Sequence, residues 1–345
     1  MKLLLSLLIV AVTGMATPAQ QTALDRLPSD LLDVVPPSAR VSGAPGGMTI
    51  GDTSCRGLPS ANVRQRIVQL AVQEWAFFGF AVVDQSDDEE TEPEPGPRRG
   101  RRRLDGGPES ARVADSIAGY WAVSPGGAWI LENQNTIWNR PGNASGRWRF
   151  PWSAAFISWV MCESGLSGAD QFQRAIAHHS YIDQAIRAQG GAAPRAAFTA
   201  HEAGTSEIAP GDLLCTARRP AYRTLAERRR QMGEGARTHC DIVVKVDDGA
   251  GHVLAIGGNV RGTVGLKILP AVRAQGLLRI ATPATGNARP IFAHLKLSAA
   301  YGAVGTSTFD GSPTFRTIAC LTDRAIPAWR AAAHLVAPPA SSCAS

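Results

Sequence analysis

The sequence has 345 residues, of which 44% are hydrophobic and 19% are charged. This composition excludes a wholly disordered chain and allows one large domain or two small ones. The formal net charge is +6, but five of the arginines fall within Arg98–Arg103, directly after an acidic run. Because the positive charge is patchy, the sequence predicts no nucleic-acid partner.

The first 19 residues are typical of a secretory signal peptide. Lys2 supplies the positive charge, Leu3–Val12 is apolar, and Thr17-Pro18-Ala19 places small residues around a cleavage point. No later apolar run approaches the roughly 20 residues that a membrane span needs. We therefore expect a periplasmic or secreted protein, with no stable membrane insertion after the signal is removed.

Residues 20–60 are rich in Pro, Gly and Ser and predict an extended lead-in segment. Residues 63–83 carry apolar side chains at helical spacing and predict a helix. Residues 84–108 combine an acidic run, four prolines and the arginine cluster, a composition that predicts a disordered charged insertion within the domain.

Three further segments precede the strands. Residues 112–121 predict a helix, whereas residues 129–149, rich in Trp, Asn and Gly, predict an irregular segment. Residues 151–164 give the strongest helical pattern, and Gly165 is a natural C-terminal stop. Residues 172–189 predict another helix.

β-branched and alternating residues then predict strands at 213–216, 239–246, 252–256 and 263–269. Helices followed by an antiparallel sheet indicate an α+β domain, which we place at residues 61–270. The pattern weakens afterwards, and residues 271–345 are interpreted as a C-terminal extension.

Six cysteines follow the signal peptide, an even number that permits three disulfides in an exported protein. Cys215 and Cys240 stand on consecutive predicted strands, which often neighbour each other, so we pair them. Cys320 with Cys343 is the second pair, and Cys55 with Cys162 follows by elimination. The sequence has no CxxC and no HExxH, so no metal and no cofactor is expected.

Three polar residues have the arrangement of a nucleophilic site. Ser153 begins a predicted helix, where the helix dipole and free N–H groups favour a nucleophile. His239 begins a strand and is the candidate base, while Asn259, after the next strand, is a candidate for orienting the imidazole. Asp241 points to the same side of its strand as His239 and is the rival for that orienting role.

The segment Trp152–Val160 (WSAAFISWV) resembles the helix that opens CHAP amidase and NlpC-type domains. The runs 210–214 (PGDLL), 239–244 (HCDIVV) and 256–260 (IGGNV) follow the order of the sheet in those domains. The chain is most similar, over about residues 63–270, to domain-of-unknown-function family 2272, which we take as a branch of that superfamily. The resemblance implies a papain-like fold, with N-terminal helices on a small antiparallel sheet, and amide-bond cleavage in bacterial cell walls.

The active relatives carry a Cys at the position of Ser153, and an alcohol is a far weaker nucleophile than a thiol. Cys162 is on the opposite side of the same helix, and Cys240 points to the opposite face of the sheet, so neither replaces that thiol. Two functions therefore stay open. One is an exported peptidoglycan amidase or endopeptidase in which Ser153 attacks. The other is a catalytically inactive module that binds peptidoglycan or peptide.

Several residues have alternative roles. Ser153 is also a favoured helix cap, and His252 is a rival base on its own strand. His178 and His179 are surface or packing residues unless one faces the cleft. Trp148 and Trp152 either line a groove or belong to the core.

Overall fold

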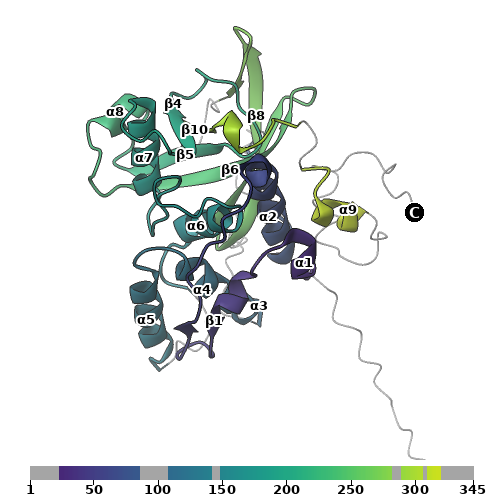
Figure 1. The fold of residues 1–345 in the computed structure, drawn as a ribbon, viewed down its shortest axis with the longest axis vertical. Coiled ribbons are helices and arrows are strands. Elements are labelled where there is room, and N and C mark those ends of the chain that lie inside the picture. Colours follow the sequence, from purple (N-terminus) through teal and green to yellow (C-terminus); the bar gives the residue numbers. More distant parts are fainter. Residues whose placement is uncertain (1–22, 86–107, 142–147, 282–288, 306–308, 320–345) are drawn as a thin grey trace, which may run out of the picture.

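The computed structural model describes residues 23–85, 108–141, 148–281, 289–305 and 309–319, to which every structural statement below refers (Figure 1). The predicted signal peptide, nearly all of the charged insertion and the predicted Cys320–Cys343 pair lie outside these residues. The helices are α1 (Ser29–Leu32), α2 (Val63–Phe77), α3 (Pro108–Arg112), α4 (Ala114–Ala122), α5 (Gly127–Trp138), α6 (Ser153–Glu163), α7 (His179–Gln189), α8 (Leu225–Arg229) and α9 (Pro313–Ala319). The strands are β1 (Val41–Ser42), β2 (Thr49–Ile50), β3 (Ala81–Asp84), β4 (Phe198–His201), β5 (Leu213–Arg219), β6 (Arg237–Asp247), β7 (His252–Val260), β8 (Thr263–Ala274), β9 (Leu277–Ile280) and β10 (Ile291–Leu297).

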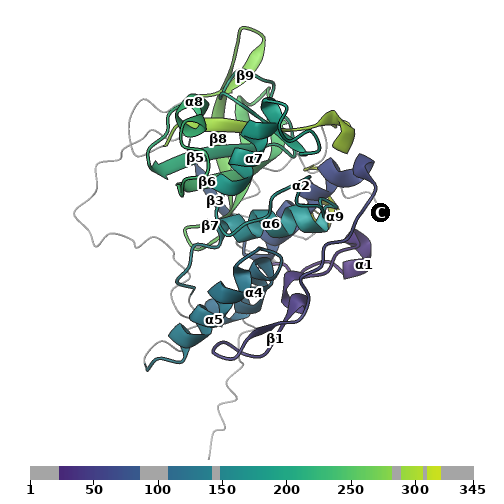
Figure 2. The ribbon, with the colours of Figure 1, turned by 60° about the vertical axis from the view of Figure 1, so that its left-hand side comes forward.

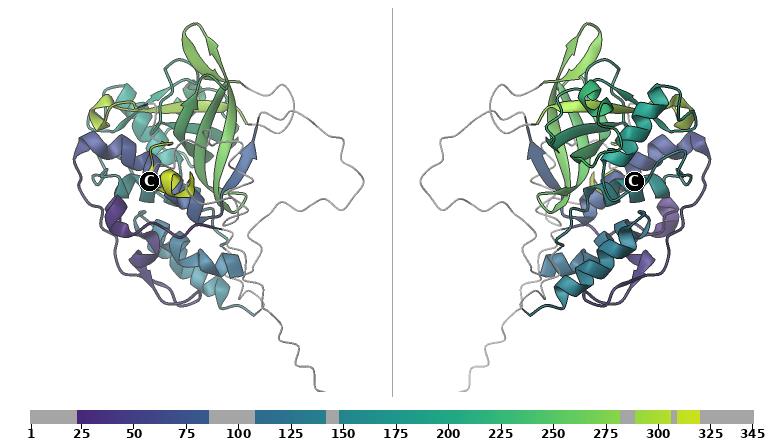
Figure 3. Two further views of the ribbon diagram at one scale, coloured as in Figure 1. Left: turned by 90° about the vertical axis from the view of Figure 1, so that its right-hand side faces the viewer. Right: turned by 90° about the vertical axis from the view of Figure 1, so that its left-hand side faces the viewer.

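One eight-stranded sheet organises the molecule. Its order is β3-β8-β7-β6-β5-β10-β4, with β9 paired to β8. All neighbours are antiparallel except β3 and β8, which run parallel at one edge, where β3 appears in blue (Figure 3). The mixed α and β content agrees with the expected α+β class. The sheet is larger than the small antiparallel one expected, and it includes a parallel pair.

The two faces of the sheet have different neighbours. Helices α2 and α6 pack on one face, and α4 and α5 lie beyond them (Figure 2). That core buries the alternate residues Ile242, Val244 and Ile256. The residues between them form a smaller cluster on the opposite face, including Val243 and Ala255. Leu214, which belongs to this smaller cluster, also lines the cavity described below.

Helix α2 is shorter than predicted because the chain turns at its end. Gly79 and Phe80 both have positive φ values, of 92° and 57°. Gly79 adopts this left-handed backbone without the steric cost of a side chain. The last residues of the predicted helix then form the parallel edge strand β3.

Three more expectations about elements were wrong. Residues 127–138, most of which fall in the segment 129–149 expected to be irregular, form α5, which buries Ile130, Leu131 and Trp138 on one side. Residues 172–178 are not helical, so the helix predicted from residue 172 begins only at His179. Strand β10 lies within the sheet between β5 and β4, so the ordered fold continues past residue 270, where the sequence analysis ended the domain.

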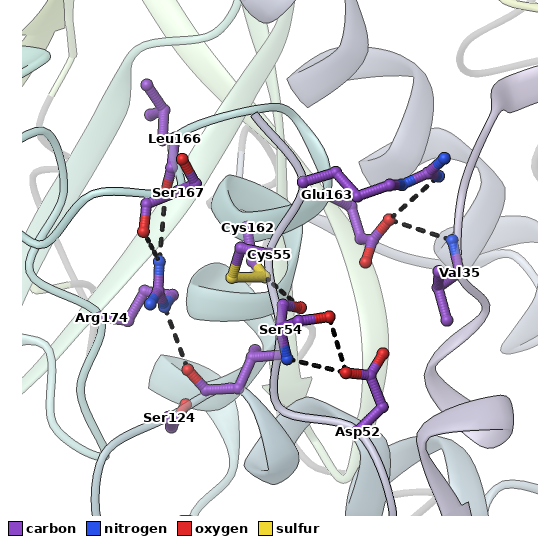
Figure 4. The surroundings of a disulfide bond; sticks show 12 residues. Val35, Asp52, Ser54, Cys55, Ser124, Cys162, Glu163, Leu166, Ser167 and Arg174 are labelled. Carbon is purple, nitrogen blue, oxygen red and sulfur yellow. Dashed lines mark hydrogen bonds and ion pairs between the residues drawn. A yellow bond between two sulfur atoms is a disulfide. The ribbon is translucent and has the colours of Figure 1, made fainter. Parts of the chain in front are cut away.

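The lead-in segment is anchored behind α6 by a disulfide between Cys55 and Cys162, as predicted (Figure 4). The neighbouring Glu163 is buried, accepts a hydrogen bond from the backbone N–H of Val35 at 3.0 Å, and pairs with the buried guanidinium of Arg40. The C-terminal half of α6 is thereby fixed to residues more than 100 positions earlier in the chain.

The predicted disulfide between Cys215 and Cys240 is also present. The two residues are directly opposed on the antiparallel strands β5 and β6, with their Cα atoms 4.1 Å apart. In the described residues, no helix has the length and apolar character needed to cross a membrane.

Candidate functional site

Ser153 is the first residue of α6 and is 8% exposed. Its hydroxyl does not cap the helix, which was the structural alternative for this residue. Instead its Oγ is hydrogen bonded to Nε2 of His178 at 2.6 Å. The hydroxyl therefore sits at the positive end of the helix dipole and in contact with an imidazole.

His178 is buried and directly precedes α7. Its Nδ1 is hydrogen bonded to the phenol of Tyr181, one helical turn further on. The pKa of His178 is lowered well below its ordinary value of 6.5. The larger cause is burial and the next is the nearby His239, and both disfavour the imidazolium. Burial raises the pKa of Tyr181, and the negative charge of Asp241 adds to this effect. At neutral pH the site therefore holds an uncharged imidazole and an uncharged phenol.

His239 and Asp241 form a second polar pair on β6. Nε2 of His239 lies 2.9 Å from Oδ1 of Asp241, and the other carboxylate oxygen accepts a hydrogen bond from Nζ of Lys267 at 2.7 Å. Burial alone would raise the pKa of Asp241, but His239 and Lys267 outweigh it and lower the pKa. Asp241 is therefore a stable carboxylate that orients the ring of His239.

The two pairs are adjacent. The ring centroids of His178 and His239 are 5.3 Å apart. We expected His239 to face Ser153 directly, but the hydrogen bond of Ser153 goes to His178. Of His178 and His179, expected to be surface or packing residues unless one faced the cleft, His178 lines the cavity.

Two consecutive glycines in β7 make this crowding possible. A Cβ atom on Gly257 would lie 2.0 Å from Oδ1 of Asp241 and 3.0 Å from Nε2 of His239. A Cβ atom on Gly258 would lie 2.5 Å from Cβ of Phe156, on α6. The absence of side chains at Gly257 and Gly258 therefore leaves room for the His239–Asp241 pair and for the close approach of α6 to β7.

Asn259 follows this glycine pair with a φ of 56°, a left-handed conformation that Asn tolerates better than most residues. Ser153, His178, His239, Asp241 and Asn259 all line one cavity of about 1010 Å³. The structure thus brings the four predicted site residues into one cavity, although Asn259 makes no hydrogen bond to the imidazole of either histidine.

The alternative residues lie elsewhere. His252 is at the opposite end of β7 from Asn259 and does not line the cavity. Trp152 packs against Phe78 and Tyr120 in the core. Trp148 packs edge-on against Trp138 at 5.0 Å between ring centroids.

Sequence reasoning assigned no role to Tyr181 or Lys267. The spacing of His178 and Tyr181, one helical turn apart, was a usable signal once that turn was placed at the site. Lys267 had no comparable signal, because its contact with Asp241 crosses the sheet. Among the described residues, no group of three or more His, Cys, Asp or Glu side chains is arranged to hold a metal ion.

Residues 112–297 match a family described as an uncharacterized protein conserved in bacteria, DUF2272. The chain belongs to the DUF2272 family. The DUF2272 region ends with the last residue of β10 and contains every site residue described above. Searches of curated proteins and of solved structures found no match to the chain.

Proposed function

We propose that this protein is an exported amide-bond hydrolase with Ser153 as its nucleophile. One observation carries the proposal, namely the 2.6 Å contact between Oγ of Ser153 and Nε2 of His178 at the N-terminus of α6, inside a large cavity. A serine becomes nucleophilic when an adjacent base removes its proton. An uncharged imidazole in hydrogen-bonding contact is such a base.

In the proposed reaction, the hydroxyl of Ser153 donates its proton to Nε2 of His178 while Oγ attacks the substrate carbonyl carbon. The reaction requires the tautomer in which Nδ1 of His178 carries a proton, and the phenol oxygen of Tyr181 is placed to accept a hydrogen bond from it. The tetrahedral intermediate collapses as His178 returns the proton to the leaving amine nitrogen. A water molecule, activated by the same imidazole, then hydrolyses the acyl ester on Ser153.

Two charges would be stabilised during this reaction. Backbone N–H groups in the first turn of α6 face the position where the carbonyl oxygen becomes negative. The carboxylate of Asp241 favours the imidazolium of His178, opposing the unfavourable effect of burial. His239, held by Asp241, lies beside the reacting imidazole and is a candidate for binding the leaving group.

The substrate class follows from the resemblance to papain-like CHAP and NlpC-type domains, which cleave amide bonds in bacterial cell walls. We propose that the stem peptides of peptidoglycan are the substrate. The two disulfides fit an oxidising compartment outside the cytoplasm, which is where this substrate is found.

Two measurements test this function. A fluorophosphonate probe should label the purified mature protein, and Ser153→Ala should remove the label while leaving the circular dichroism spectrum unchanged. Incubation with purified peptidoglycan should release peptide fragments with new amino termini, detected by mass spectrometry, and Ser153→Ala should release none. Absence of both labelling and fragments in the unmodified protein would refute the proposed hydrolysis.

A second candidate is a non-catalytic module that binds peptide in the same cavity. The limited exposure of Ser153, 8%, favours this reading, because a nucleophile must be reached by its substrate. Peptide binding without labelling or cleavage is the result that would select it.

A further inference from the structure

Five arginines line the cavity that contains Ser153. Arg218 is near the end of β5, Arg237 begins β6, Arg261 stands in the turn between β7 and β8, Arg279 lies on β9, and Arg289 precedes β10. These residues come from segments spread over more than 70 positions, so the fold gathers them rather than the local sequence.

The positive charge on this lining is not balanced by described acidic residues. Asp241 is the one carboxylate among them that lines the cavity, and His239 and Lys267 already engage both of its oxygens. Within the described part of the chain, Arg218, Arg237, Arg261 and Arg289 have no hydrogen-bonded or ion-paired side-chain partner.

Two buried or half-buried arginines elsewhere in the fold have carboxylate partners. Arg228 forms two hydrogen bonds to the carboxylate of Asp183, at 2.7 and 2.6 Å, and Arg26 does the same with Glu74. In the cavity, Arg218 instead lies close enough to Arg289 to lower its pKa, in addition to the larger effect of burial. The strand register gives the geometric reason: Arg218 lies two residues after Thr216 and Arg289 two residues before Ile291, and Thr216 and Ile291 are paired across β5 and β10. Two neighbouring guanidinium groups without a carboxylate form a site for an anionic group of a ligand.

His294 gives a second, independent indication of a ligand. It is 1% exposed and lines the same cavity. Its Nε2 lies 2.8 Å from Oδ2 of the buried Asp212, while its Nδ1 is buried without a hydrogen-bond partner. In the tautomer whose Nε2–H donates to Asp212, Nδ1 is an unfilled acceptor. A buried acceptor is costly to leave unpaired, and a ligand N–H would satisfy it.

Carboxylates and phosphates both suit the arginines, but neither ionised group offers a donor to Nδ1 of His294. A peptide bearing carboxylates supplies anionic oxygens and backbone N–H groups together. We propose that the cavity binds an acidic peptide, with its carboxylates on Arg218 and Arg289 and a backbone N–H on His294. Placing its scissile carbonyl at Ser153 rests on the proposed function, whereas the binding itself requires no turnover.

The test uses the full mature chain carrying Ser153→Ala, so that nothing is cleaved. Isothermal titration calorimetry compares blocked pentapeptides with alternating alanine and glutamate, alanine and glutamine, or alanine and lysine. The glutamate peptide should bind at least tenfold more tightly than the glutamine peptide, with an affinity that falls as salt is added. Equal affinities for these two peptides would overturn the proposal.

Variants then locate the binding. Arg218→Gln and Arg289→Gln should each weaken the glutamate peptide about tenfold, which corresponds to about 1.4 kcal/mol. Arg223→Gln is the matched control, because Arg223 is exposed and outside the cavity lining, and its affinity should stay within about twofold. Equal effects of all three substitutions would contradict an arginine subsite.

Two further arms separate the remaining outcomes. Tripolyphosphate should bind more weakly than the glutamate peptide, and tighter binding of tripolyphosphate would overturn the peptide assignment in favour of a phosphate ligand. Tight peptide binding by the Ser153→Ala protein, combined with no cleavage by the unmodified protein, would refute the hydrolase while leaving this inference intact.

Discussion

The rings of His178 and His239 lie 5.3 Å apart, and the hydroxyl of Ser153 is hydrogen bonded to the first of them. The two imidazoles have different partners. His178 is held by the neutral phenol of Tyr181, whereas His239 is held by the carboxylate of Asp241. In the proposed mechanism, His178 accepts the proton of Ser153 and His239 is a neighbour oriented by a carboxylate, and substitutions can distinguish the two roles.

Replacing each histidine tests this division. His178→Ala should slow fluorophosphonate labelling of Ser153 by about 10²- to 10⁴-fold, because the base in contact with the hydroxyl is lost. His239→Ala should slow labelling less, since the contact of Ser153 with His178 remains. His252→Ala, in a strand residue outside the cavity, is the control and should label at the unmodified rate. A larger effect at His239 than at His178 would assign the base to His239.

A thiol at position 153 probes the same environment without a substrate. In Ser153→Cys, the thiol stands at a helix N-terminus beside an imidazole, and both features lower a thiol pKa. We expect iodoacetamide to alkylate this variant about tenfold faster than glutathione at pH 7. The double variant Ser153→Cys/His178→Ala should lose most of that advantage. Equal alkylation rates in the two variants would show that His178 does not activate position 153.

Gly257→Ala tests whether the site depends on the close approach at β7. The added methyl would stand 2.0 Å from Oδ1 of Asp241, so the His239–Asp241 pair must move. We expect a loss of about 1–3 kcal/mol in the free energy of unfolding, together with slower labelling of Ser153. Gly235→Ala is the matched control, because no described atom lies within 4 Å of the point where its Cβ would stand, and its φ is not positive. Urea denaturation of both variants measures the difference.

The lowered pKa of His178 predicts acid sensitivity. Below pH 6.5 this histidine binds a proton in the unfolded chain but not in the folded chain. The free energy of unfolding therefore falls as the pH falls, and it levels off below the folded-state pKa. The slope should reach at most about 1.4 kcal/mol per pH unit. Asp241 adds a similar loss only near and below its ordinary pKa of 3.8. Burial also lowers the pKa of His201, so His201 contributes between pH 6.5 and about 4.5 as well, and the part due to His178 is the difference between the unmodified protein and a His178 variant.

His178→Gln should flatten the curve of unfolding free energy against pH in that interval, as measured by urea denaturation. The same shift places the acid limb of any hydrolytic activity below pH 6.5, because the neutral base persists to lower pH. An unchanged stability slope in His178→Gln would mean that another group causes the acid sensitivity.

The residues grouped from the sequence line one cavity, but the hydrogen bonds between them could not be predicted. Ser153, His239 and Asp241 were found from residue type, helix position and strand alternation, all of which are local properties. His178 was not assigned because its contact with Ser153 spans 25 positions and depends on a non-helical approach to α7. Such a contact depends on tertiary packing, which the hydrophobic periodicity of a local segment does not predict.

The same reason explains the missed elements. Strand β10 has seven residues and falls in the region interpreted as a C-terminal extension, yet it pairs on both sides within the sheet. The last turns of helix α5 contain two Asn and one Trp, which have low helix propensity. Burial of Ile130, Leu131 and Trp138 nevertheless stabilises the helix. In both cases long-range contacts decide what the local composition leaves open.

The two described disulfides have a consequence for how the chain matures. Cys55 bonds to Cys162 and Cys215 bonds to Cys240, so each bond joins cysteines that follow one another in the sequence. A chain that enters an oxidising compartment from its N-terminus, and is oxidised as each cysteine emerges, therefore acquires these native bonds in order. Neither bond has to be broken and reshuffled, so an oxidase suffices where crossed pairings would call for an isomerase.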